Sequence, residues 1–151
     1  MLSKIINNID TTNKQTTIDT STTYQTIEGF GASAAWWAQY VGGWENLDEI
    51  MELLYSKEKG AGLDIYRYNL GTGSQDDTHI TDVDRRTQGF LQKDGTYDWS
   101  RDANAQKALA SAQKANKDLK VTLFSNSAPV WLTKNGKAYC SCLLYTSDAA
   151  D

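Results

Sequence analysis

The polar side chains best placed to recognise a ligand stand at the ends of two strand-like stretches. Residues 63–70 (LDIYRYNL) contain Asn69 near their end, and residues 120–125 (KVTLFS) are followed by Asn126 and Ser127. Alternating apolar residues rich in β-branched and aromatic types are typical of strands. Folds of α/β type assemble their sites at the carboxyl ends of parallel strands. We therefore expect Asn69, Asn126 and Ser127 to line one binding site.

Arg67 lies inside the first of these stretches, among apolar and aromatic residues. A guanidinium in such surroundings is unfavourable without a partner, so we predict a carboxylate or several carbonyl oxygens beside it. Two roles stay open. The partner could be a structural acid, or a catalytic carboxylate whose charge Arg67 stabilises.

Aromatic side chains are frequent in the predicted loops and strand ends. They are Trp36, Trp37, Trp44, Tyr66, Tyr68, Trp99 and Trp131. A sugar ring can lay its C–H face against such a side chain while its hydroxyls bond to nearby polar groups. Core or loop packing is the alternative for each one taken singly. Their position beside the asparagines favours a carbohydrate-binding surface.

The run Gly29-x-Gly31-x-x-Ala34 matches the fingerprint of dinucleotide-binding turns. That chemistry needs a helix opening at the third position and an acidic residue at the end of the next strand. Here Trp36 follows almost at once, and the next strand ends with Asn69. A small Rossmann-like nucleotide binder is an alternative that these departures disfavour.

His79 is the only histidine, so neither a histidine-based triad nor a zinc site of several imidazoles can form in this chain. We expect it on a loop surface. Asp76, Asp77, Asp82 and Asp84 lack the fixed spacing of a metal-binding loop and are expected to be solvated. No metal and no cofactor are predicted.

Two helices are predicted between the strands. Asn46 and Glu49 form a capping-box pattern at the start of the first, which Gly60 and Gly62 should end. The second begins near Ser100. Its apolar stripe comprises Ala105, Ala108, Leu109 and Ala112.

Two further strand-like stretches precede the first helix: residues 16–27 predict one or two short strands, and residues 25–33 a strand that runs into a glycine turn. The resulting order is strand, helix, strand, helix, strand. This order predicts a parallel sheet, either in an open doubly wound fold or in part of a (β/α)8 barrel. A whole barrel takes about 250 residues, so three strands are well short of closing one.

Composition gives few hints of a partner. The formal net charge is −4 with both signs interspersed, which does not favour nucleic acid. No stretch is apolar enough to span a membrane. The first residues lack the apolar run of a secretory signal, so the chain is expected to be cytoplasmic as written, and secreted if its start is misassigned.

Residues 142–151 (CLLYTSDAAD) resemble the translation of a transposase sequencing adapter. We therefore expect the native sequence to stop near residue 141 and to be a fragment of a longer protein. Cys140 is then the last cysteine that could be native, so no disulfide framework is expected.

Four motifs in order resemble glycoside hydrolase family 30, which contains glucosylceramidases, endo-β-1,6-galactanases and related xylanases. They are GFGASAAWWAQYVGGW, LDIYRYNLGTGS, YDWSRDANAQKAL and FSNSAPVWLTKNG. The double tryptophan and the YRYN strand are most similar to the endo-β-1,6-galactanase-like branch. The resemblance covers residues 25 to about 139.

The resemblance implies the N-terminal part of a (β/α)8 barrel, with its first three strands in residues 25–141 and an attached β-structure to which residues 1–24 contribute. It implies a retaining hydrolase of β-linked glycans whose acid/base and nucleophile glutamates follow the fourth and seventh strands. Neither position exists here, so no catalytic residue is assigned and the fragment is expected to be inactive. A non-catalytic carbohydrate-binding protein is the alternative from another class.

The same resemblance implies which residues bind the substrate. The set is Trp36, Trp37, Arg67, Asn69, Asn126 and Trp131. Trp36 and Asn126 are expected to shape the glycone subsite, and Arg67 to support the charge of the nucleophile. For Trp131, a subsite role and a packing role both stay open.

Overall fold

The computed structural model describes residues 20–71 and 73–138. At its centre is a three-stranded sheet in the order β1 (Gly31–Ser33), β2 (Ile65–Leu70) and β3 (Lys120–Ser125). All the pairings are parallel. The prediction of an α/β chain with a parallel sheet is therefore confirmed, and β3 has the predicted bounds.

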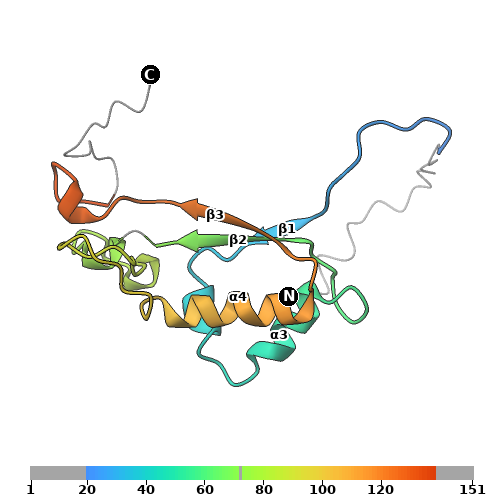
Figure 1. The fold of residues 1–151 in the computed structure, drawn as a ribbon, viewed down its shortest axis with the longest axis horizontal. Coiled ribbons are helices and arrows are strands. Elements are labelled where there is room, and N and C mark those ends of the chain that lie inside the picture. Colours follow the sequence, from blue (N-terminus) through green and yellow to red (C-terminus); the bar gives the residue numbers. More distant parts are fainter. Residues whose placement is uncertain (1–19, 72, 139–151) are drawn as a thin grey trace, which may run out of the picture.

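Three α-helices lie against one face of this sheet (Figure 1). They are α2 (Ala38–Val41), α3 (Leu47–Tyr55) and α4 (Ala103–Ala115). The opposite face carries no helix in the part of the chain that the structure describes. None of the described helices is long and apolar enough to cross a membrane.

The core fills the space between β2 and the helices. Met51 and Tyr55 of α3, Tyr66 of β2, and Ala108 and Ala112 of α4 are all fully buried. The rings of Tyr55 and Tyr66 meet with centroids 5.6 Å apart. Small alanine side chains let α4 approach the sheet closely, which confirms the predicted stripe on that helix.

The helix ends differ from the prediction. The side chain of Asn46 makes no capping hydrogen bond, so the predicted capping box is wrong. Helix α3 ends at Tyr55, before Gly60, because the Ser56 hydroxyl accepts hydrogen bonds from the backbone of Glu58 and Lys59 and turns the chain. Helix α4 begins at Ala103, later than expected.

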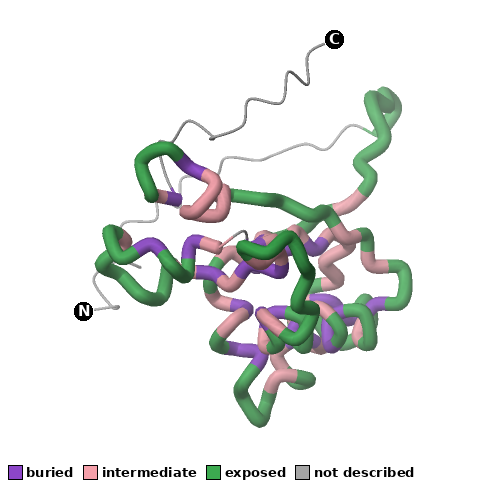
Figure 2. Tube along the Cα trace, turned by 60° about the vertical axis from the view of Figure 1, so that its left-hand side comes forward, coloured by how far each residue is buried: buried purple, intermediate pink, exposed green. Residues whose placement is uncertain are grey.

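The strand predicted from residue 25 begins only at Gly31. Residues 22–30 form no strand, because β1 pairs with β2 on one side and no described strand lies on its other side. Residues 20–28 run away from the sheet and are exposed (Figure 2). Of the one or two short strands predicted in residues 16–27, none forms within residues 20–27, and residues 16–19 lie outside the described residues, as do the adapter-like residues 142–151.

Strand β3 is mostly exposed, in contrast to the central strand β2 (Figure 2). Leu123 is 64% exposed although Val121, two residues earlier, packs against the helix-side core. Side chains two residues apart on a strand share a face. No described helix follows β3 to cover Leu123, so this side of the sheet is open at its edge.

The long polar stretch between β2 and α4 is ordered by short turns. It contains η1 (Ser74–Asp76), η2 (Val83–Arg85) and an antiparallel bridge between Leu91 and Tyr97. Together with η3 (Val130–Leu132), these turns gather at the end of the molecule where β2 and β3 end (Figure 1).

Candidate functional site at the carboxyl edge of the sheet

The register of the sheet decides which side chains share a face. Arg67 is paired with Ser33 of β1 and Thr122 of β3, and Asn69 is paired with Phe124. Tyr66 and Tyr68 are buried against the helices. Side chains alternate along a strand, so Arg67 and Asn69 lie on the opposite, helix-free face.

The Arg67 guanidinium lies over the ring of Phe124, with its central carbon 3.5 Å from the ring centroid. Among the described residues no carboxylate forms an ion pair with Arg67, so the carboxylate or carbonyl partners expected for it stay a prediction. This face of the described sheet is open, and Arg67 is only half-buried. A cation above an aromatic face is attracted by the ring quadrupole, which holds the guanidinium in place.

Asn69 is the buried polar group of this face, at 7% exposure. Its Nδ2 has no hydrogen-bond partner among the described residues. A buried amide donor without a partner is unfavourable, so a group from outside the described residues is expected to accept from it. The Nδ2 of Asn69 is therefore the donor on this face that is free to bind an acceptor from a ligand or from another part of the protein.

Trp36 and Trp37 are neighbours in sequence but have different surroundings. Trp37 packs against the core, and its Nε1 donates to the backbone oxygen of Ser33 at 2.9 Å. Trp36 is 37% exposed, with the guanidinium of Arg85 5.6 Å from its ring centroid. Trp36 thus offers more of its ring surface to a ligand than Trp37 does, and the binding role expected for Trp37 stays a prediction.

The turn that leads into the two tryptophans contains Ala35 in the left-handed region, with φ +36°. This conformation is uncommon for residues other than glycine and is found where the surrounding structure holds the backbone. Here the Ser33 hydroxyl accepts from the Ala35 N–H at 3.2 Å, and the Ala34 N–H donates to the Arg67 oxygen at 2.9 Å. The backbone around Trp36 is therefore fixed to the sheet.

Asn126 and Trp131 follow β3 and do not join the Arg67 and Asn69 pair. Asn126 is exposed just beyond the end of the strand. Trp131, in η3, is half-buried and lines a separate hollow of about 230 Å³ with Gly73 and Arg101. The site thus has a centre on β2, with Trp36 beyond β1 and Asn126 beyond β3.

The glycines before β1 are needed for packing. A Cβ on Gly31 would lie 2.4 Å from the backbone oxygen of Ile65, and one on Gly29 would lie 2.6 Å from the Cβ of Asp64. No helix opens directly after Ala34, since α2 begins at Ala38. Close approach of two strands therefore accounts for the glycines that resemble a dinucleotide fingerprint.

Two buried carboxylates escaped the sequence analysis. Asp102 precedes α4 and accepts a hydrogen bond from the Tyr68 hydroxyl. Asp77, expected in a solvated loop, is fully buried and accepts from the backbone of Ala138 at 2.6 Å and of His79 at 2.9 Å. Tyr68 is 34 residues from Asp102 in the sequence, and Ala138 is 61 residues from Asp77. No local sequence pattern indicates contacts over such separations.

The Asp77 carboxylate is held ionised by its neighbours. Burial alone would raise its pKa, but the backbone N–H groups of Ala138 and His79, and then the His79 ring, keep the pKa below its usual value. No group of three or more His, Cys, Asp or Glu side chains within residues 20–71 and 73–138 could hold a metal ion.

A helix-covered parallel sheet with polar and aromatic groups at its carboxyl edge is the arrangement by which α/β proteins bind ligands. Residues 13–146 match the family described as O-glycosyl hydrolase family 30, and the chain belongs to that family.

Three known proteins illustrate the similarity. An endo-β-1,6-galactanase of Hypocrea rufa is 32% identical over 143 residues, covering 79% of this chain and 29% of the galactanase. The crystal structure of a conserved exported protein from Bacteroides fragilis superposes with a TM-score of 0.69 at 32% identity, covering 80% of this chain and 27% of that protein.

A third comparison bears on the fold alone. The catalytic domain of a xylanase C from Talaromyces cellulolyticus, of the same family, is 24% identical with a TM-score of 0.50, covering 82% of this chain and 28% of that domain. This chain therefore spans less than a third of the length of each of these relatives.

Proposed function

We propose that this chain is the first part of a retaining glycoside hydrolase that cleaves β-linked glycans, similar to the endo-β-1,6-galactanases. The observation that carries the proposal is that Arg67 and Asn69 share one face at the carboxyl edge of the sheet of a family 30 chain, where the buried Nδ2 of Asn69 has no partner among the described residues. An amide and a guanidinium on an open face suit the oxygens of a sugar and of a carboxylate.

The open sheet supports placing this chain at the start of a (β/α)8 barrel. Strands β1, β2 and β3 are parallel and in sequence order, and the helices that the structure describes all lie on one face. Closing the barrel would add strands beside β3 and would cover the face of Arg67 and Asn69. Residues 1–24 would join the attached β-structure, and the native barrel sequence would extend from residue 25 to about residue 141.

Retaining hydrolysis needs two carboxylates about 5 to 5.5 Å apart, one as acid/base and one as nucleophile. The five described glutamates lie elsewhere: Glu28 precedes β1, Glu49 and Glu52 are on α3, and Glu45 and Glu58 lie just before and just after that helix. In the complete enzyme the two carboxylates would come from later strands. Arg67 would then stabilise the charge of the nucleophile, while Asn69 and Asn126 bond to sugar hydroxyls and Trp36 supports the ring.

Because both catalytic carboxylates would come from later strands, the chain by itself has no acid and no nucleophile at the site. The purified chain is therefore expected to release no reducing sugar from β-1,6-linked galactan. The protein encoded when the reading frame is extended through the later strands should release it. Release of sugar by the isolated chain would overturn the assignment of both carboxylates to later strands.

A further inference from the structure

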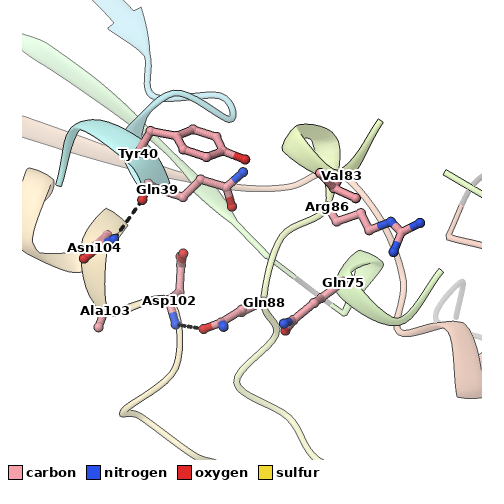
Figure 3. Close-up of a pocket in the computed structure, with 9 residues that line it drawn as sticks. All are labelled: Gln39, Tyr40, Gln75, Val83, Arg86, Gln88, Asp102, Ala103 and Asn104. Atoms are coloured by element: carbon pink, nitrogen blue, oxygen red, sulfur yellow. Dashed lines mark hydrogen bonds between the residues drawn. The ribbon is translucent and has the colours of Figure 1, made fainter. Parts of the chain in front are cut away.

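A second hollow lies on the other side of the sheet from Arg67 and Asn69. This amide cleft, of about 540 Å³, opens between α2, the start of α4 and the polar connection after β2 (Figure 3). Its polar wall comprises Gln39, Gln75, Arg86, Gln88, Asp102 and Asn104. A volume of this size is in the range of small-molecule sites.

The cleft is separate from the site on the helix-free face. Tyr68 points to the helix side of β2, and its hydroxyl reaches Asp102 in the wall of the cleft at 2.6 Å. Arg67 and Asn69, on either side of Tyr68 in the strand, point the other way. A ligand in the amide cleft would therefore not touch the groups assigned to hydrolysis.

Two side-chain amides of the wall present free donors. The Oε1 of Gln75 accepts from Arg101 at 2.7 Å, and the Oε1 of Gln88 accepts from the backbone N–H of Asp102 at 2.5 Å. These bonds fix each amide by its oxygen. The Nε2 of each has no partner among the described residues and remains able to donate.

Two other amides are held in the opposite sense and present free acceptors. The Nδ2 of Asn104 donates to the backbone oxygen of Gln39 at 3.0 Å, and the Nε2 of Gln39 donates to the backbone oxygen of Asp84 at 2.8 Å. The Oδ1 of Asn104 and the Oε1 of Gln39 keep their accepting capacity. Figure 3 shows that these amides come from the wall opposite Gln75 and Gln88.

Asp102 adds a rigid acceptor between the two pairs. The residue is 6% exposed, and the Tyr68 hydroxyl occupies only its Oδ2. Arg86 donates to the backbone oxygen of Ile80 through Nε and Nη2, which leaves its Nη1. One anionic and one cationic group in the same wall give no preference for a charged ligand.

We propose that the amide cleft is an accessory binding site for one neutral polyhydroxylated unit, such as a single hexose residue of a glycan. A hydroxyl both donates and accepts, and so suits a wall with free amide donors on one side and free oxygens on the other. Tyr40 and Val83 add partly exposed apolar surface for the C–H face of the ring. The choice of a sugar rests on the proposed function.

Binding is tested by NMR on the ¹⁵N-labelled chain titrated with methyl β-D-galactopyranoside. The side-chain NH2 signals of Gln75 and Gln88 should shift together, with a dissociation constant on the order of millimolar. The NH2 signal of Gln113, exposed on α4 outside the cleft, should stay unchanged. Gln75→Ala should weaken binding about fivefold, as expected for one lost hydrogen bond, and Gln113→Ala should not.

The proposal is overturned if the Gln75 and Gln88 signals do not move, or if Gln75→Ala binds as the unmodified chain does. The titration of the unmodified chain locates the ligand without any substitution, so a variant that fails to fold does not leave the question open. Hydrolysis of galactan by the extended protein depends on the other face. Failure of the extended protein to hydrolyse galactan would refute the proposed function, whereas the response of the Gln75 and Gln88 signals to the sugar would not change.

Discussion

The hydroxyl of Tyr68 donates a 2.6 Å hydrogen bond to Oδ2 of Asp102, which joins the central strand to the residue preceding α4. Both side chains are buried. Burial raises the pKa of Asp102 to about 6, and the bond from Tyr68 opposes that rise. Burial, and then the bond to Asp102, raises the pKa of the Tyr68 hydroxyl, which therefore stays protonated. Helix α4 is thus fixed to the sheet by a buried polar contact as well as by its alanines.

Removing the Tyr68 hydroxyl should destabilise the chain. We expect Tyr68→Phe to lower the free energy of unfolding by about 2 kcal/mol at neutral pH, because a buried carboxylate loses its donor. Urea denaturation followed by circular dichroism measures this. Tyr66→Phe is the matched control, since Tyr66 is buried on the same strand and its hydroxyl has no partner among the described residues. Equal losses in the two variants would contradict the assigned role of the Tyr68 bond.

The raised pKa of Asp102 predicts a pH dependence with a definite sign. The folded chain holds this proton more tightly than the unfolded chain, where the pKa is near 3.8. This group therefore favours folding at low pH, and its contribution is lost as the pH rises through about 6. Asp102→Asn should remove the effect and keep the left-handed backbone at φ +53°, which Asn tolerates.

The measurement is the difference in unfolding free energy between Asp102→Asn and the unmodified chain, taken from about pH 4 to about pH 7. Subtraction cancels the opposite trend of carboxylates with lowered pKa, such as Asp48 and Asp98. The difference should move in favour of the Asp102→Asn variant as the pH rises, because the amide of the variant does not ionise. A difference that is constant over this range would show that Asp102 is not buried in the folded chain.

Asp77 should hold the segment after η3 to the polar connection. Asp77→Ala leaves the N–H groups of Ala138 and His79 without an acceptor. We expect a loss of about 2 to 3 kcal/mol and faster hydrogen exchange at the Ala138 amide. Asp76→Ala, at the exposed neighbouring position, should leave that exchange rate unchanged. Equal protection of Ala138 in both variants would refute the contact.

Asn69 should matter for ligand binding more than for folding. Because its Nδ2 has no partner among the described residues, Asn69→Leu should change stability by less than about 1 kcal/mol. Asn116→Leu is the contrasting control, since both ends of that buried amide are hydrogen-bonded, and it should lose about 2 kcal/mol. In the extended enzyme Asn69→Leu should lower kcat/KM for galactan about tenfold to hundredfold. Unchanged kcat/KM would remove Asn69 from the site.

Trp37 should matter more for stability, and Trp36 more for ligand binding. Trp37→Ala removes core packing and the bond to the Ser33 oxygen, so a loss of about 3 kcal/mol is expected. Trp36→Ala should have less than half that effect on stability and should raise KM of the extended enzyme. Thermal unfolding and galactan kinetics on both variants measure this. A larger stability loss for Trp36→Ala would contradict the assignment.

The parts of the fold that follow local periodicity could be predicted from the sequence. The alternation of residues 120–125 and the spacing of Ala105, Ala108 and Ala112 indicated a strand and a helix face directly. The start of β1 could not be predicted, since residues 25–30 have strand-like composition but no neighbouring strand to pair with in the described chain. Strand pairing is a tertiary property that composition does not reveal.

The site was predictable by residue type but not by environment. Arg67 was expected beside a carboxylate or several carbonyl oxygens because the sequence of its strand is typical of a buried one, and in the described chain its neighbour on the open face is Phe124. Trp36 and Trp37 are the same residue type side by side, and only the folded chain places Trp37 against Ser33 and Trp36 near Arg85. Asp102 accepts the hydrogen bond of Tyr68, which is 34 residues earlier in the sequence, so its role could not be predicted from its own segment.

The most direct test of the central claim is the stereochemistry of the reaction. The gene would be extended from codon 141 through the later strands, and the protein followed by ¹H NMR during cleavage of β-1,6-linked galactan. A double displacement at two carboxylates predicts that the β-anomer of the new reducing end appears first and that mutarotation produces the α-anomer later. First appearance of the α-anomer, or no cleavage of any β-linked glycan, would contradict the account.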